Sequence, residues 1–178
     1  MIAGLAIGVY KLLKSRGLDG LKVEELQTMA IKLTTKIDAL NLEIRESEAA
    51  IERLFEKARV TKTRSEEVSL ANRIKTLSKK KEMKQSAVFQ LERELCAGNN
   101  LMIIKQHERD LRQAGTWKKL EKIKPEKMEE WLTERNLEQQ THQEQLNQLT
   151  GLTESEMQTG GYDEDLDDIL DVIHDVKQ

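Results

Sequence analysis

The sequence predicts an all-α protein: a long antiparallel helical hairpin, followed by shorter helices and a C-terminal acidic amphipathic helix. Of the 178 residues, 34% are charged and only 3% are aromatic, and Pro125 is the single proline. Few residues therefore interrupt helices, and few large side chains are available for one thick core. An apolar register that recurs in two long segments indicates narrow seams between helices instead.

The first long helix is predicted over residues 22–58, which contain neither Gly nor Pro. Apolar or small residues recur there at alternating steps of four and three, which is typical of a coiled-coil-like helix with one seam. At 1.5 Å per residue such a helix is roughly 55 Å long and needs a partner along its length. The register consists of Leu26, Ala30, Leu33, Ile37, Leu40, Ile44, Ser47, Ile51, Leu54 and Ala58.

The second long helix is predicted after a polar, basic link, ARVTKTRSEE. Two such helices joined by a short link are typical of an antiparallel hairpin. The second register consists of Leu70, Ile74, Leu77, Lys81, Lys84, Val88, Leu91 and Leu95. A basic patch interrupts it, formed by Lys79, Lys80, Lys81 and Lys84. The lysine stems can lie along the seam with their ammonium groups in water, or the patch can bind lipid head groups or an acidic face of a neighbouring subunit.

Glycine and proline predict the breaks in the second half of the chain. CAGNN, residues 96–100, combines Gly with Asn, which end helices or act as hinges, so we expect a hinge there. Gly115 is a second weak point, within an amphipathic segment that extends to Leu120. Pro125 suits the first turn of a further helix, which is predicted to end at Gly151. A flexible linker is expected over residues 150–161.

Charge divides the chain into a basic body and an acidic tail. Residues 1–125 contain 26 Lys and Arg against 17 Asp and Glu, whereas residues 126–178 contain 3 against 15. Such a division favours attraction of the body to anionic surfaces and of the tail to the body. The predicted organisation is an N-terminal amphipathic helix (1–20), a hairpin core (21–121) and an acidic regulatory region (122–178).

The residues that carry chemistry are sparse. The sequence contains no GxGxxG, GxxxxGK[ST], HExxH or CxxC motif, and His107, His142 and His174 are far apart along the chain. Glu138 and His142 share a face at helical spacing, but such pairs are abundant on Glu-rich helices. Cys96 is the single cysteine, which excludes an internal disulfide. A reactive thiol beside the expected hinge is one interpretation, but a lone Cys at the end of an apolar register is more often a small hydrophobe. We expect no enzyme, no catalytic residue, no metal site, no cofactor and no nucleic-acid partner.

The C-terminal stretch DEDLDDILDVIHDV predicts a short helix, residues 162–177, with an aliphatic face and an Asp-rich face. Asp is a mediocre helix former, so this helix is expected to fold on the surface that its apolar face meets. That surface belongs either to the chain's own body or to another protein. An ordinary packed terminal helix is the alternative. The apolar face consists of Leu166, Ile169, Leu170, Ile173 and Val176.

This order of elements resembles an ESCRT-III protein of the charged multivesicular body type, within a superfamily that includes phage-shock protein A. The tail is similar to the family's MIT-interacting motif at Asp163, Leu166, Ile169, Leu170, Ile173 and His174. Ile169 stands where the family usually has Arg, and His174 where it has Lys or Arg. The resemblance implies a closed monomer that opens by merging the second long helix with the following segment, polymerises on membranes, and recruits an MIT-domain AAA ATPase.

The N-terminal stretch MIAGLAIGVYKLLKSRG is predicted to be a membrane-binding helix. It is too short to span a bilayer, and its basic residues follow the apolar run, whereas in a signal peptide they precede it. The alternatives are a core helix and close helix pairing through Gly4 and Gly8. The apolar contacts to lipid are expected from Ile2, Leu5, Ile7, Val9, Leu12 and Leu13, and the contacts to anionic head groups from Lys11, Lys14 and Arg16.

Two functional hypotheses follow. The first is a membrane-remodelling subunit that opens from an autoinhibited monomer, with anionic lipids and copies of itself or related subunits as partners. It is expected to be cytoplasmic and peripheral on the cytoplasmic face of membranes. The second is a soluble coiled-coil adaptor or scaffold protein without a direct role at membranes.

Overall fold

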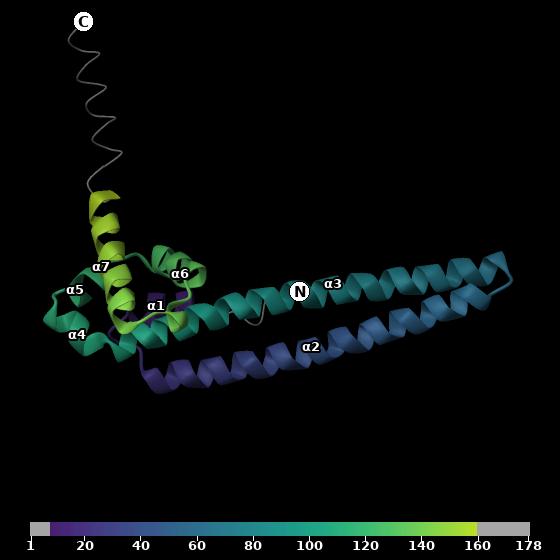
Figure 1. Ribbon diagram of the computed structural model, residues 1–178, viewed down its shortest axis with the longest axis horizontal. Helices are drawn as coiled ribbons and strands as arrows, with labels where there is room; N and C mark the ends of the chain where they lie inside the picture. The colour runs from purple at the N-terminus through teal and green to yellow at the C-terminus, as the bar shows by residue number, and fades with distance from the viewer. Residues whose placement is uncertain (1–7, 160–178) are drawn as a thin grey trace, which may run out of the picture. The chain divides into compact units, whose positions relative to one another are not determined.

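The computed structural model describes residues 8–159, and every regular element in that range is helical (Figure 1). The chain divides into two compact units. One, here called the hairpin unit, comprises residues 22–102; the other, the short-helix unit, comprises, among the described residues, 8–21 together with 103–159. The all-α prediction, with a long hairpin and shorter helices after it, is confirmed. The division itself differs from the predicted one, because residues 103–121 belong with the short helices.

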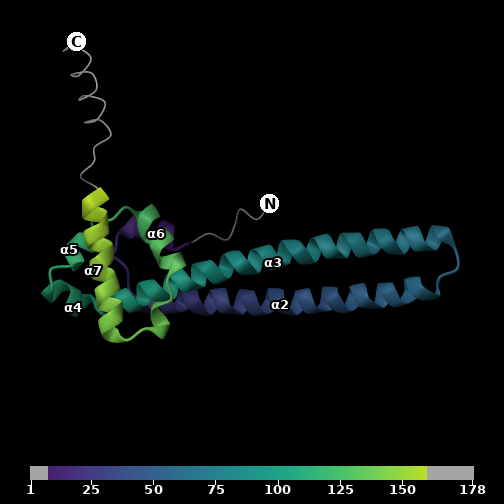
Figure 2. The same cartoon turned by 45° about the horizontal axis from the view of Figure 1, so that its top comes forward.

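The hairpin unit is formed by α2 (Val23–Val60) and by α3 (Arg64–Gln106) as far as residue 102, two long helices that run side by side in both views (Figures 1 and 2). The last turn of α3, residues 103–106, belongs to the short-helix unit. Both helices have glutamates in the first turn, and α2 ends with Lys57 and Arg59, so the charges complement the helix dipoles. The connection is only residues 61–63, shorter than the predicted polar link, because both helices extend into it.

A thin apolar seam joins α2 to α3. Its centre consists of Ile37, Ile44, Val88 and Leu91, with Leu33, Leu40 and Leu95 packed against them. All seven belong to the registers predicted from the sequence. Ion pairs between Glu43 and Lys84 and between Glu48 and Lys81 show that the helices run antiparallel, since residue numbers rise on one helix as they fall on the other.

The predicted hinge at residues 96–100 is wrong, because α3 continues through CAGNN without a break. Gly98 does not adopt a positive φ, and a Cβ atom at this position would lie 2.6 Å from Cε of Met29 on α2. Ala97 and Asn100 are buried, and the Asn100 amide donates to Sγ of Cys96 at 3.6 Å. The small residues therefore allow close packing inside a continuous helix.

The short-helix unit packs several helices around one core. Its elements are α1 (Val9–Arg16), α4 (Glu108–Gln113), α5 (Trp117–Leu120), α6 (Pro125–Glu134), the 3₁₀ helix η1 (Leu137–Gln139) and α7 (His142–Thr159). Gly115, with φ of 74°, separates α4 from α5, and Pro125 occupies the first turn of α6, as predicted. The best-buried apolar side chains are those of Val9, Ile104, Leu111, Trp117, Leu120, Leu132, Leu137 and Leu149.

The helix predicted to run from Pro125 to Gly151 is interrupted and then continues further than expected. α6 ends at Glu134, and α7 passes through Gly151 to Thr159, so the linker prediction is wrong for residues 150–159. A capping box explains the new start: Glu144 accepts from the Thr141 amide at 2.8 Å, and the Glu144 amide donates to Oγ1 of Thr141 at 3.4 Å.

Burial of α7 explains why Gly151 is tolerated. Leu149, Leu152 and Thr153 are all buried, so packing on both sides of the glycine outweighs its unfavourable helix propensity of about 1 kcal/mol. The predicted terminal helix, residues 162–177, lies outside the described residues.

Candidate functional site

The predicted membrane-binding residues are divided by the fold of the short-helix unit. Val9 and Leu13 are buried and Leu12 is half-buried, whereas Lys11, Lys14 and Arg16 are exposed; Ile2, Leu5 and Ile7 lie outside the described residues. α1 packs on α6, and the Tyr10 hydroxyl donates to Oε1 of Glu126 at 3.0 Å. In this conformation the apolar side chains of α1 pack into the core of the short-helix unit, whereas its basic side chains are exposed to solvent.

The predicted basic patch is likewise divided. Lys84 forms an ion pair with Glu43 at 2.9 Å and Lys81 with Glu48 at 3.5 Å, each lysine retaining 28% of its side-chain exposure. These two lysines therefore occupy seam positions and reach across to α2. Lys79 and Lys80 are exposed. The residues of the MIT-interacting resemblance, Asp163, Leu166, Ile169, Leu170, Ile173 and His174, lie outside the described residues.

A charged network surrounds Trp117 in the short-helix unit. The buried indole donates from Nε1 to Oδ1 of Asp19 at 2.7 Å, and Lys105 and Arg112 lie over its ring at 5.1 and 5.0 Å. Lys105 is 7% exposed and pairs with Glu108 at 2.7 Å. Burial alone would raise the pKa of Glu108, but hydrogen bonds from Lys105 and Arg112 outweigh it and hold that pKa below its ordinary value. The network fixes the chain after α1 to α4 and α5.

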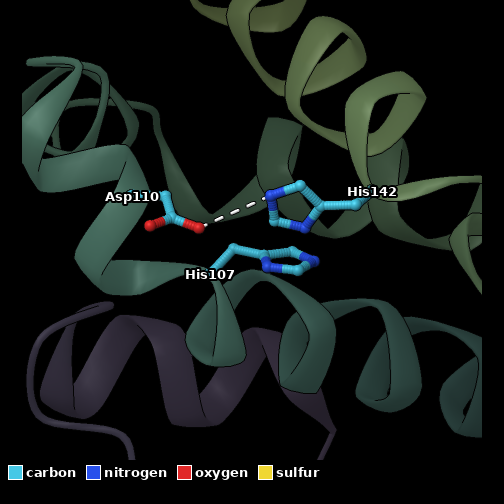
Figure 3. A group of neighbouring side chains, drawn as sticks. All are labelled: His107, Asp110 and His142. Atoms are coloured by element: carbon cyan, nitrogen blue, oxygen red, sulfur yellow. Dashed lines mark ion pairs between the residues drawn. The ribbon is translucent and has the colours of Figure 1, made fainter.

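His107 and Asp110 meet His142, which lies 32 residues beyond Asp110 in the sequence, at the beginnings of α4 and α7 (Figure 3). His107 is the residue between α3 and α4, Asp110 lies in the first turn of α4, and His142 is the first residue of α7. The two imidazole centroids are 4.3 Å apart in an edge-to-face arrangement, and Nε2 of His142 lies 3.5 Å from Oδ2 of Asp110. Among residues 8–159, these are the three His, Cys, Asp or Glu side chains that lie close enough together to hold one metal ion. One possible ligand atom from each lies within 4.8 Å of the others.

Gln145 fixes the orientation of the His107 ring. Nε2 of Gln145 donates to the carbonyls of Leu137 at 2.7 Å and Gln140 at 3.2 Å, so its Oε1 is the atom that faces Nε2 of His107, at 2.7 Å. An amide oxygen only accepts, and therefore His107 carries a proton on Nε2. In the neutral ring, Nδ1 is then left with the lone pair.

Sequence reasoning missed this group because it misplaced the helix break. It considered Glu138 and His142 as neighbours on one helix, whereas Glu138 lies on η1 and His142 begins α7. Two signals were present: His107 and Asp110 at helical i, i+3 spacing, and the Thr141 and Glu144 capping box that places His142 at a helix start. Only the fold brings the two histidines together.

Comparison of the chain with protein-family models, with curated proteins and with solved structures returned no match. Among residues 8–159, no helix combines the length and the apolar character needed to cross a bilayer.

Proposed function

We propose that this chain is a non-enzymatic, ESCRT-III-like subunit that polymerises on anionic membranes and remodels them. The observation that carries the proposal is the surface of the hairpin unit. Among the described residues, all the exposed large hydrophobic side chains lie on this unit, and they include both phenylalanines of the chain. They are Ile31, Leu42, Phe55, Val60, Val68, Met83 and Phe89.

Exposed hydrophobic side chains along two long helices favour contact with a further helix. Phe55 and Phe89 retain 51% and 62% of their exposure, so the seam between α2 and α3 does not use them. A hairpin from a second copy, lying alongside, would cover such side chains and extend the assembly. Lateral association of hairpins is the elementary step of a filament.

Membrane contact is proposed to come from cations on the basic body. Lys79 and Lys80 face solvent on α3, and Lys11, Lys14 and Arg16 face solvent on α1. Each such residue near an anionic surface contributes about 1 kcal/mol. Insertion of the apolar side of α1 would require Val9 and Leu13 to leave the core, which agrees with a helix that binds the bilayer only after the monomer opens. Regulation by the acidic tail and recruitment of an MIT-domain ATPase belong to the same proposal.

The second candidate function is a coiled-coil adaptor without a membrane role. The burial of Val9 and Leu13 and the hydrogen bond from Tyr10 to Glu126 favour it, because they use α1 as an internal packing element. The two candidates differ in what residues 8–16 contact when lipid is present.

Co-sedimentation with vesicles tests the proposal. The full chain should bind vesicles that contain phosphatidylserine, and binding should weaken with added salt, because exposed charges are screened. Replacing Lys79 and Lys80 with Gln should reduce binding severalfold. The matched control replaces Lys118 and Lys119, an exposed pair in the short-helix unit, and should bind more tightly than the Lys79 and Lys80 variant. Equal binding to anionic and neutral vesicles would instead support the adaptor.

Electron microscopy tests the polymerisation step. Phe89→Ser changes a side chain that is mostly exposed, so the helical content by circular dichroism should stay unchanged. Filaments formed by the full chain on anionic vesicles should become fewer or shorter in this variant. Unchanged filaments would show that Phe89 is not part of the lateral contact.

A further inference from the structure

We propose that His107, Asp110 and His142 form a binding site for a borderline divalent transition-metal ion, with Zn²⁺ as the reference ion. The proposal does not depend on the proposed membrane function, since all three residues belong to the short-helix unit. Two imidazoles and one carboxylate form a donor set that favours zinc and its neighbours over magnesium or calcium, which prefer oxygen ligands alone.

The spacing of the three side chains suits one small ion after modest rotations. Zn–N and Zn–O bonds of about 2.0–2.2 Å in a tetrahedral site place ligand atoms roughly 3.3 Å from one another. In this structure one possible ligand atom from each of the three side chains lies within 4.8 Å of the other two. Asp110 and His142 retain 50% and 53% of their side-chain exposure, so both can rotate by the distance required without disturbing packed neighbours.

The third ligand is already oriented. Because Oε1 of Gln145 accepts from Nε2 of His107, the His107 ring is held at one end, and its Nδ1 is the nitrogen available to a metal. A hydrogen bond from the second ring nitrogen to an amide or carboxylate is the usual outer support of a metal-binding histidine. Gln145 is buried and is held in turn by two backbone carbonyls, so this support is built into the core.

The exposure of the site indicates the coordination that the ion would have. Three protein ligands leave a fourth position for water in a tetrahedral zinc site. The ion would replace the present contact between Nε2 of His142 and Oδ2 of Asp110 and would join α4 to the start of α7. A ligand that binds only the folded state stabilises it, so metal binding should raise the melting temperature of the short-helix unit.

Calorimetric titration of the full chain with ZnCl₂ tests the site. We expect the full chain to bind Zn²⁺, and Asp110→Asn and His142→Gln each to weaken this binding at least tenfold. The control is Glu138→Gln, which changes an exposed carboxylate on η1 outside the group and should bind as the unaltered chain does. Both affected residues are about half exposed, so these variants should fold, which circular dichroism checks. Co²⁺ in place of Zn²⁺ should give visible absorption bands that the same two variants lose.

Thermal unfolding supplies a second readout. The melting temperature is followed by tryptophan fluorescence. A 100-fold excess of Zn²⁺ over the dissociation constant should raise it by roughly 10–20 °C, and the rise should vanish in His142→Gln. The proposal is overturned if the full chain binds no Zn²⁺. It is equally overturned if Asp110→Asn and His142→Gln bind Zn²⁺ as tightly as the unaltered chain, which would place the ion elsewhere.

Discussion

The middle of the hairpin and the centre of the short-helix unit bury their apolar side chains to different degrees. In the middle of the hairpin, Ile37, Ile44 and Val88 each keep 8% of their exposure, whereas Leu111, Trp117 and Leu120 in the short-helix unit keep 1%. Two helices form only two walls, so a side chain between them stays open at the edges. Several short helices crossing at angles can enclose a side chain completely.

The ion pairs of the two units differ in the same way, since those that join α2 to α3 are more exposed than the pair between Lys105 and Glu108 beside Trp117. The ion pairs of the hairpin join lysines that are 28% exposed to glutamates that are half exposed, and pairs of that kind contribute little. In the short-helix unit, Lys105 is 7% exposed and contacts both Glu108 and the Trp117 ring. The candidate metal site lies in this unit too. The hairpin therefore has mainly exposed ion pairs, while the short-helix unit holds the side chains whose positions are fixed.

The largest expected effect comes from removing the centre of the short-helix unit. Trp117→Ala should reduce the free energy of unfolding by about 3–5 kcal/mol, because it leaves a cavity and deletes the hydrogen bond to Asp19. Residues 22–102 contain no tryptophan, so fluorescence of the remaining Trp131 reports on the short-helix unit alone. Urea denaturation followed by this signal measures the loss.

The matched change in the hairpin is Ile44→Ala, followed by far-ultraviolet circular dichroism. Because the seam leaves Ile44 partly open to water, the loss should be about 2 kcal/mol, at the low end for a core isoleucine. A loss as large as that of Trp117→Ala would show that the thin seam is packed as tightly as the enclosed core, and the comparison would fail.

The hairpin could be predicted from the sequence because its structure follows from one local period. Ile37, Ile44, Val88 and Leu91 occupy the expected register. Outside the hairpin, Pro125 begins α6 and Gly115 adopts a positive φ between α4 and α5, as their backbone preferences predict. The predictions at Gly98 and Gly151 were wrong because tertiary packing determines whether a helix ends at a glycine or continues through it. Close contact with Met29 at one position and burial of Leu149 and Leu152 around the other keep the helix intact.

The candidate metal site could not be predicted in the same way. His107 and His142 are brought together by the path of the chain through α4, α5 and α6, and no local pattern encodes that path. The basic patch was recognisable as four lysines, but its division depends on which residues of α2 lie opposite. Glu43 and Glu48 lie opposite Lys84 and Lys81, which only the pairing of the two helices determines.

An intermediate effect is expected on acidification. In the folded chain the pKa of Glu108 lies below its ordinary value of 4.5, so its contribution to stability is present above that pH and is lost as the pH falls through the lower, folded value. The hydrogen bond from Glu121, followed by that from Trp117, lowers the pKa of Asp19 in the same sense. Glu121, whose pKa is raised by its hydrogen bond to Asp19, acts in the opposite sense.

Between pH 7 and pH 3.5 the fluorescence melting temperature should therefore fall by more than the one measured by circular dichroism, which is dominated by the long helices. Glu108→Gln should cost about 2 kcal/mol at pH 7, because it removes the carboxylate 2.7 Å from Nζ of Lys105, whose side chain is only 7% exposed, and the pH dependence should become smaller. Glu48→Gln in the hairpin is the control and should change stability by less than about 0.5 kcal/mol. Equal shifts in both signals would contradict the assigned role of the charged network.

The smallest effects come from the two glycines inside long helices, one in each unit. A Cβ atom at Gly151 meets no atom within 4 Å, so Gly151→Ala should stabilise the short-helix unit by about 0.5–1 kcal/mol through helix propensity. Gly98→Ala should gain less than this, since the new methyl group would have to displace Cε of Met29 from 2.6 Å. Urea denaturation measures the first by fluorescence and the second by circular dichroism. An equal gain at both positions would mean that Gly98 is tolerated in α3 but not required by its packing, and the explanation given for an unbroken helix through CAGNN would then be incomplete.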